Sequence, residues 1–132
     1  MKIVSYVKEG SEQLVVVVNG LVYDMDVLHP DMPNSMNMFL MYWDNVYPVA
    51  KAGVQMILDG KRGSGIGVPV ETLQLLAPVP FPTSCRDGYA FRQHVAAARR
   101  NRKVDMIAEF DQYPIFYFTN HHTIQGPGNI LC

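Results

Sequence analysis

The chain has 132 residues, the length of one ordinary domain, and its 48% hydrophobic content excludes an extensively disordered protein. Its 11 lysine and arginine residues against 12 aspartate and glutamate residues give a net charge of −1. No overall field therefore attracts nucleic acid or an anionic membrane, and we expect neither as a partner.

The N-terminal segment predicts a small antiparallel β-meander. Residues 2–7 and 13–18 are rich in Val and Ile, as β-strands are, and a turn containing Gly10 joins them. The pair Asn19-Gly20 is typical of a tight turn, and it leads into a third predicted strand over 21–25.

Neither the start of the chain nor its cysteines indicates secretion. Lys8 and Glu9 interrupt the first apolar run before it reaches the length of a signal peptide core. Cys85 and Cys132 are too few for a disulfide framework, and they belong to no Cys-x-x-Cys metal pattern. Since no run is long enough to span a bilayer either, we expect a cytoplasmic protein with reduced thiols.

The next stretch predicts a loop followed by helices. Residues 29–34 contain two prolines and predict the loop, and the apolar stretch from 35 to about 60 predicts one or two helices broken near Pro48. Methionines and aromatic residues cluster in this part of the chain: Met32, Met36, Met38, Met41, Phe39, Tyr42 and Trp43. An adaptable core or packing surface is the preferred interpretation of the cluster, and a ligand-binding methionine patch is the alternative.

The glycine-rich segment 60–67 lacks the Gly-Lys-Ser/Thr ending of a phosphate-binding loop and the glycine spacing of a dinucleotide site. We expect it to be a flexible linker between an N-terminal part and the rest of the chain. Residues 73–76 predict a short strand, and the prolines within 77–82 predict an extended lead into the next element.

Residues 84–94 belong to a segment that predicts a helix beginning near Asp87, and this helix would place Asp87 and His94 on one face. Their separation is nearly two turns, so the side chains leave the same side of the helix about 10 Å apart along its axis. This arrangement suits a carboxylate that holds a hard cation and an imidazole that acts as a base on the same ligand. The alternatives are a helix cap at Asp87 or Ser84 and a hydrogen-bonded histidine on a half-buried face.

Basic residues at the end of this predicted helix suit the negative end of its dipole; they are Arg99, Arg100, Arg102 and Lys103. An anchor for a substrate carboxylate is the alternative, with no arginine assigned to it. Residues 114–118 predict a strand with no later strand to pair with, so we expect an open edge. His121 and His122 would point to opposite faces of an extended strand, and we do not expect them to share a metal ion. A shared ion in a loop is the alternative.

Three blocks of sequence together resemble one enzyme family. They are Arg-Asp-Gly-Tyr-Ala-Phe-Arg-Gln-His-Val at 86–95, Tyr-Pro-Ile-Phe-Tyr-Phe-Thr-Asn at 113–120 and Gly-Pro-Gly at 126–128. In order and approximate spacing they resemble the opening of the catalytic domain of the fumarylacetoacetate hydrolase family. The resemblance covers about residues 75–132, whereas residues 1–74 are only loosely similar to the variable N-terminal domain of many bacterial members.

The expected fold class is α+β. The β-meander and helices over 1–74 would form an accessory N-terminal domain, and the resemblance implies that 75–132 begin a mixed β-roll or sandwich catalytic domain.

The resemblance also implies a site. Asp87 resembles the first metal ligand of the family, His94 the general base, and Tyr89 and Tyr117 the residues that contact the substrate. The implied cofactor is Mg²⁺, or else Mn²⁺ or Ca²⁺, bound to the oxygens of a small keto or enol acid. The histidine would activate water, and the cation would stabilise the enolate that leaves when a C–C bond breaks.

The family's further metal ligands, a Glu-x-Glu pair and a later Asp, follow the Gly-Pro-Gly block, where only residues 129–132 remain. We therefore expect a truncated chain whose other ligands lie outside it. Glu109 and Asp111 have a similar spacing but precede the strand over 114–118, so solvated charges are their preferred interpretation. One carboxylate alone does not hold Mg²⁺ tightly.

Two functions are compatible with these observations. The first is a fragment of a metal-dependent enzyme that cleaves a C–C bond in acylpyruvate-like β-dicarbonyl acids, inactive on its own; related family members are decarboxylases, hydratases and isomerases. The second is a non-catalytic remnant or segment that folds, oligomerises or binds a partner. For the full-length protein the resemblance implies a homodimer.

Overall fold

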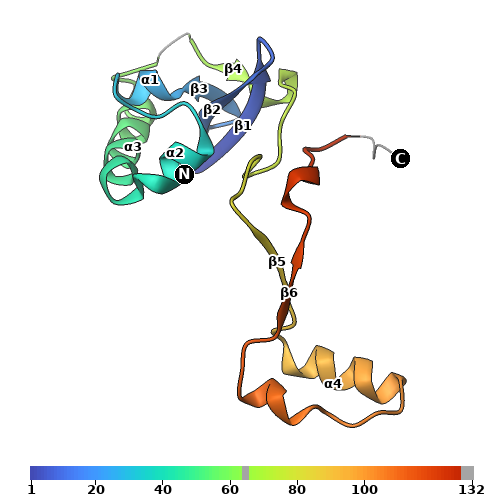
Figure 1. Cartoon of the computed structure of the whole chain (residues 1–132). Helices are drawn as coiled ribbons and strands as arrows, with labels where there is room; N and C mark the ends of the chain where they lie inside the picture. The colour runs from blue at the N-terminus through green and yellow to red at the C-terminus, as the bar shows by residue number, and fades with distance from the viewer. Residues whose placement is uncertain (64–65, 129–132) are drawn as a thin grey trace. The chain divides into compact units, whose positions relative to one another are not determined.

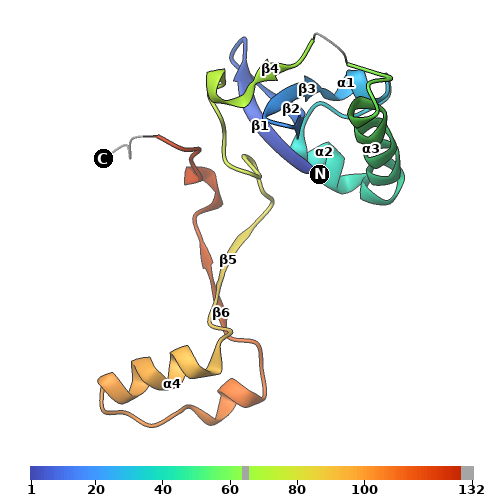
Figure 2. The same cartoon turned by 180° about the vertical axis from the view of Figure 1, so that it is seen from behind.

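A computed structural model describes residues 1–63 and 66–128 (Figures 1 and 2). The chain forms two compact units. Unit 1 comprises Met1–Phe81 together with the segment from Ile124, and unit 2 comprises Pro82–Thr123. These compact units divide the chain at other places than the predicted family domains, 1–74 and 75–132. The two family domains stay a prediction.

Unit 1 contains a four-stranded antiparallel sheet. Its strands, in the order in which they pair, are β1 (Lys2–Lys8), β2 (Ser11–Val18), β3 (Leu21–Asp24) and β4 (Val68–Pro69). Two-residue loops join the first three strands. The loop residues Glu9, Gly10, Asn19 and Gly20 have φ angles of 52°, 78°, 52° and 80°, as this type of hairpin turn requires. The predicted meander is confirmed.

Three helices lie on one side of this sheet in both views (Figures 1 and 2). They are α1 (Met25–Leu28), α2 (Met36–Met41) and α3 (Trp43–Leu58). Leu14 and Val16 of β2 are fully buried and form a core with Phe39 of α2 and Ala50 of α3. Gly53 lets α3 approach α1 closely, since an added Cβ would lie 2.9 Å from the Cβ of Leu28.

The break in the predicted helical region falls at Tyr42, so the prediction of a break near Pro48 is wrong. Pro48 lies inside α3. Because proline has no N–H, the Asp44 carbonyl lacks its helical hydrogen-bond donor, and Asp44 is exposed to solvent. The methionine cluster is divided between core and surface. Met36 is buried, whereas Met41 is 69% exposed.

The glycine-rich segment 60–67 does not connect the two units, contrary to expectation. It joins α3 to β4 within unit 1, and β4 pairs with β3. Gly63 and Gly67 lie against the buried ring of Tyr23, where an added Cβ would come 2.9 Å and 2.7 Å from ring carbons. Close packing on an aromatic ring therefore explains these two glycines. Residues 64 and 65 lie outside the described residues.

The strand predicted over 73–76 is reduced to a single bridge. After a 3₁₀ turn, η1 (Val70–Thr72), Leu75 pairs with Tyr6 on β1. The Gly-Pro-Gly block packs on this same segment, because an added Cβ on Gly126 would overlap the Leu75 carbonyl oxygen. This contact accounts for the inclusion of the last described residues in unit 1.

Unit 2 is a two-stranded antiparallel ribbon with a long connection between its strands (Figure 1). Its elements are β5 (Cys85–Gly88), α4 (Arg92–Asn101), η2 (Ala108–Asp111), β6 (Phe116–Thr119) and η3 (His121–Thr123). β6 pairs with β5 along one edge, and within the described residues its other edge pairs with no strand, in line with the expected open edge.

The helix predicted to begin near Asp87 is wrong in its first half. Asp87 lies on β5 and caps no helix, while α4 begins only at Arg92 with Phe91 as its N-cap residue. The ladder with β6 satisfies the backbone of β5, and Gly88 is a poor helix former. Asp87 and His94 therefore belong to different elements.

The described residues form a mixed α+β structure with antiparallel sheets, in agreement with the predicted class. Within residues 1–63 and 66–128, no helix combines the length and the apolar character needed to cross a membrane. The 16 residues of α3 fall short of the roughly 20 that span a bilayer.

Candidate functional site

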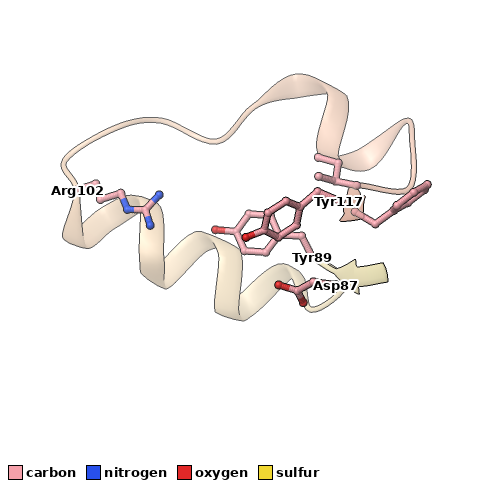
Figure 3. Close-up of a pocket in the computed structure, with 6 residues that line it drawn as sticks. Asp87, Tyr89, Arg102 and Tyr117 are labelled. Atoms are coloured by element: carbon pink, nitrogen blue, oxygen red, sulfur yellow. The ribbon is translucent and has the colours of Figure 1, made fainter. Parts of the chain in front are cut away.

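Three of the four site residues predicted from sequence line one pocket of unit 2. The pocket has a volume of about 340 Å³ and is lined by Asp87, Tyr89, Arg102, Ile115, Phe116 and Tyr117. It is named the Asp87–Arg102 pocket below (Figure 3). The fourth predicted residue, His94, is not among its lining residues.

The register of β5 and β6 brings the lining residues together. Asp87 pairs directly with Tyr117, and the Tyr89 N–H extends the ladder by donating a 2.9 Å hydrogen bond to the Ile115 carbonyl. Side chains alternate between the faces of a strand, and directly paired residues share a face. Asp87, Tyr89, Ile115 and Tyr117 therefore share one face of the ribbon.

A cation–π cluster occupies the other face of the ribbon. The guanidinium carbon of Arg86 lies 5.3 Å from the ring centroid of Phe116 and 5.0 Å from that of Phe118. The two phenyl rings meet edge to face, with centroids 5.6 Å apart. A slip of one residue would exchange the two faces, so these contacts help to fix the register that forms the pocket.

Arg102 supplies the positive charge of the pocket. It is the C-cap residue of α4, and its backbone N–H is bonded to carbonyls of the last helical turn. Figure 3 shows its guanidinium at one end of the pocket and the Asp87 carboxylate at the other, with Tyr89 and Tyr117 between them. The pocket therefore combines a cationic end, an aromatic middle and an anionic end.

Sequence reasoning did not distinguish Arg102 from its basic neighbours. In the described structure, Arg99 donates to the backbone carbonyl of Asp105, and Arg100 lines a separate hollow beside Arg92. Consecutive helical residues point about 100° apart, so the choice depends on where α4 ends. The basic residues indicate the region where the helix ends, but no Gly or Asn marks the exact residue, since it is Lys103 that takes a left-handed φ of 56°.

His94 is connected to the pocket through Tyr89. The imidazole meets the Tyr89 ring edge to face, with centroids 6.3 Å apart, and Phe110 meets the same ring at 6.4 Å. Tyr89 is thus packed between side chains from α4 and η2 while it lines the pocket. His94 therefore contacts a residue of the pocket without lining the pocket itself.

Glu109 and Asp111 have the spacing of the family's Glu-x-Glu metal ligands. They lie on η2 and do not line the Asp87–Arg102 pocket. Asp111 accepts two hydrogen bonds from Arg92, of 2.9 Å and 3.1 Å. The hydrogen bond from Arg92 holds the pKa of the Asp111 carboxyl below its ordinary value, and Asp111 raises the pKa of Arg92. Asp111 is thus a solvent-exposed charge ahead of β6, as expected, and it also pairs with Arg92.

The described residues do not complete a magnesium site. Within residues 1–63 and 66–128, no three His, Cys, Asp or Glu side chains are grouped so that they could hold a metal ion. Mg²⁺ requires near-octahedral oxygen coordination, and the pocket offers Asp87 as its single carboxylate. Arg102 adds a positive charge to the same pocket.

The two adjacent histidines lie close together. His121 and His122 belong to η3, after the end of β6, and their ring centroids are 4.1 Å apart. They lie in a 3₁₀ turn and not in an extended strand, so the expectation of opposite strand faces does not apply to them. The Asn120 side chain accepts a 3.0 Å hydrogen bond from the His122 N–H and shapes this turn.

Comparison with known proteins adds no relative, since no protein-family model and no curated protein matches the chain. The chemistry of the pocket residues is therefore the basis for its interpretation.

Proposed function

We propose that unit 2 binds a small keto or enol acid in the Asp87–Arg102 pocket, as the opening of a catalytic domain of the fumarylacetoacetate hydrolase type. One observation supports this proposal above all others. Arg102 lines the same pocket as Asp87, Tyr89 and Tyr117, the three residues for which the family resemblance implies ligand contacts.

Each lining residue has chemistry suited to such an acid. A guanidinium binds a carboxylate through two parallel hydrogen bonds, so Arg102 is proposed to hold the acid group. The phenol hydroxyls of Tyr89 and Tyr117 can donate to keto or enol oxygens. Asp87 remains the proposed first ligand of a divalent cation, Mg²⁺, Mn²⁺ or Ca²⁺, and His94 the proposed base. C–C cleavage would need metal ligands beyond the described residues.

A second candidate function is binding without catalysis. The ribbon exposes large aromatic side chains, with Tyr117 67% and Phe118 66% exposed. Exposed aromatic surface of this kind is typical of sites that bind a partner. In this case the chain folds and associates, and the homodimer implied for the full-length protein is one such association.

The test of acid binding is a calorimetric titration of the full chain with acetylpyruvate. The Arg102→Gln variant should bind acetylpyruvate more weakly by a factor on the order of ten, because it loses a charge-assisted hydrogen bond. The Arg100→Gln variant is the matched control, since Arg100 lies near the same helix end but lines a different hollow. Its affinity should equal that of the wild type.

Equal affinities of the wild type and the Arg102→Gln variant would overturn the proposal, as would an equal loss in the Arg100→Gln variant. Turnover separates the two candidate functions. Binding without consumption of acetylpyruvate in Mg²⁺ is expected for the described ligand set, and metal-dependent turnover would show that further ligands are present.

A further inference from the structure

Two opposite charges of the Asp87–Arg102 pocket are left unpaired. Within residues 1–63 and 66–128, neither the Asp87 carboxylate nor the Arg102 guanidinium has a hydrogen-bond or ion-pair partner. By contrast, Arg86 packs on aromatic rings, and Arg92 and Arg99 donate hydrogen bonds to oxygen atoms. The pocket charges are therefore available to a ligand.

We propose that this pocket takes a zwitterion, an amino-substituted carboxylic acid whose carboxylate binds Arg102 and whose ammonium group binds Asp87. The inference rests on the proposed function for the contact at Arg102. It departs from that function at Asp87, where an organic ammonium group occupies the position assigned to a metal ion.

The donor set suits an ammonium group better than it suits Mg²⁺. One carboxylate neutralises the single charge of an ammonium group, and aromatic faces attract the same group through cation–π contacts. Mg²⁺ instead needs several oxygen ligands at octahedral positions. The pocket provides that combination, one carboxylate at Asp87 with the rings of Tyr89 and Tyr117 beside it.

The arrangement of the charges selects the length of the ligand. Both tyrosine rings lie between Asp87 and Arg102 in Figure 3, and Ile115 adds apolar lining. An α-amino acid carries both charges on one carbon and cannot reach past a phenol ring to the second charge. A chain of several methylenes between ammonium and carboxylate can span the rings and bury its apolar part against them.

The experiment is a titration of the full chain in EDTA, followed by NMR chemical shifts, with three ligands of one chain length. These are ε-aminohexanoate, hexanoate and hexylamine. The zwitterion should bind more tightly than either singly charged ligand, by a factor on the order of ten, and glycine should bind more weakly than ε-aminohexanoate.

Two variants test which residue binds each end of the ligand. Asp87→Asn should reduce the affinity for ε-aminohexanoate to that for hexanoate, and Arg102→Gln should reduce it to that for hexylamine. The matched controls, Asp105→Asn and Arg100→Gln, should bind like the wild type, since neither residue lines the pocket.

The failures of the two proposals are distinguishable. If hexanoate binds as tightly as ε-aminohexanoate, with both dependent on Arg102, the zwitterion inference is overturned and acid binding stands. If neither hexanoate nor acetylpyruvate depends on Arg102, both proposals are overturned. Equal binding of glycine and ε-aminohexanoate would overturn the length argument.

Discussion

Glu12 caps helix α2 from the neighbouring sheet. Its carboxylate Oε1 accepts a 2.9 Å hydrogen bond from the backbone N–H of Met36, the first residue of α2, and a 2.8 Å hydrogen bond from the Ser5 hydroxyl. Ser35, the N-cap residue, makes no side-chain capping bond. Glu12 thus satisfies a helix N–H and the buried Ser5 hydroxyl together, and its negative charge suits the helix N-terminus.

Replacing Glu12 by Ala should therefore destabilise unit 1. Met36 N–H and the Ser5 hydroxyl would lose their acceptor, a loss that costs about 1–3 kcal/mol in the free energy of unfolding. Urea unfolding followed by the fluorescence of Trp43 would measure it. Glu71→Ala, at an exposed position of η1, is the control and should change the free energy by less than about 0.5 kcal/mol. Equal stabilities of the two variants would contradict this role of Glu12.

At the scale of elements, an ion pair joins α4 to η2 in the long connection between β5 and β6. Arg92 in the first turn of α4 holds Asp111 of η2 through two hydrogen bonds, and Tyr89 packs on Phe110 of the same 3₁₀ turn. Both charged side chains are more than half exposed, at 60% and 56%, so solvent screens the pair and its contribution is small.

The sign of its pH dependence follows from the lowered pKa of Asp111, caused first by the hydrogen bond from Arg92. A carboxyl group whose pKa is lower in the folded state stabilises it above the unfolded pKa, about 3.9 for Asp. That stabilisation is lost as the pH falls through the lowered value. The raised pKa of Arg92 acts only in strong alkali.

We expect the amide shifts of η2 to change on acidification below about pH 4, as Asp111 takes up a proton and the pair opens. An NMR titration would follow this change. Asp111→Asn should remove the transition, whereas Asp105→Asn, outside the pair, should retain it. A transition that persists in the Asp111→Asn variant would show that another carboxyl group is responsible.

At the scale of the whole molecule, the two units differ strongly in their burial of apolar side chains. Unit 1 has a continuous core around β2, built from its strands and all three of its α-helices. Within the described part of unit 2, Val95 is the single apolar side chain that is fully buried. A two-stranded ribbon with so small a core has little hydrophobic stabilisation.

Hydrogen exchange should reveal this difference. Amides of β2 are expected to exchange most slowly, through global unfolding, whereas amides of β5 and β6 should exchange faster through local opening of unit 2. The Val95→Ala variant should accelerate exchange in unit 2 and leave β2 unchanged. Uniform protection of both units would show instead that they unfold together.

The sequence alone determined the structures that depend on neighbouring residues. The meander was predictable because strand periodicity and the turn residues Gly10 and Asn19-Gly20 act over a few positions. The loop over 29–34 was predictable from its prolines in the same way. Sequence resemblance also grouped Asp87, Tyr89 and Tyr117, which the structure places in one pocket.

Only the tertiary structure decided the features that join distant parts of the chain. The pairing of β5 with β6 puts Asp87 on a strand, although its local sequence favoured a helix. The end of α4 selects Arg102 among four basic neighbours, and contacts with Tyr23 explain Gly63 and Gly67. The physical reason is that a local pattern specifies local dihedral angles. Pairing between two strands that are distant in sequence depends on hydrogen bonds and packing that offset the entropy of loop closure. Neither strand alone specifies the segment with which it pairs.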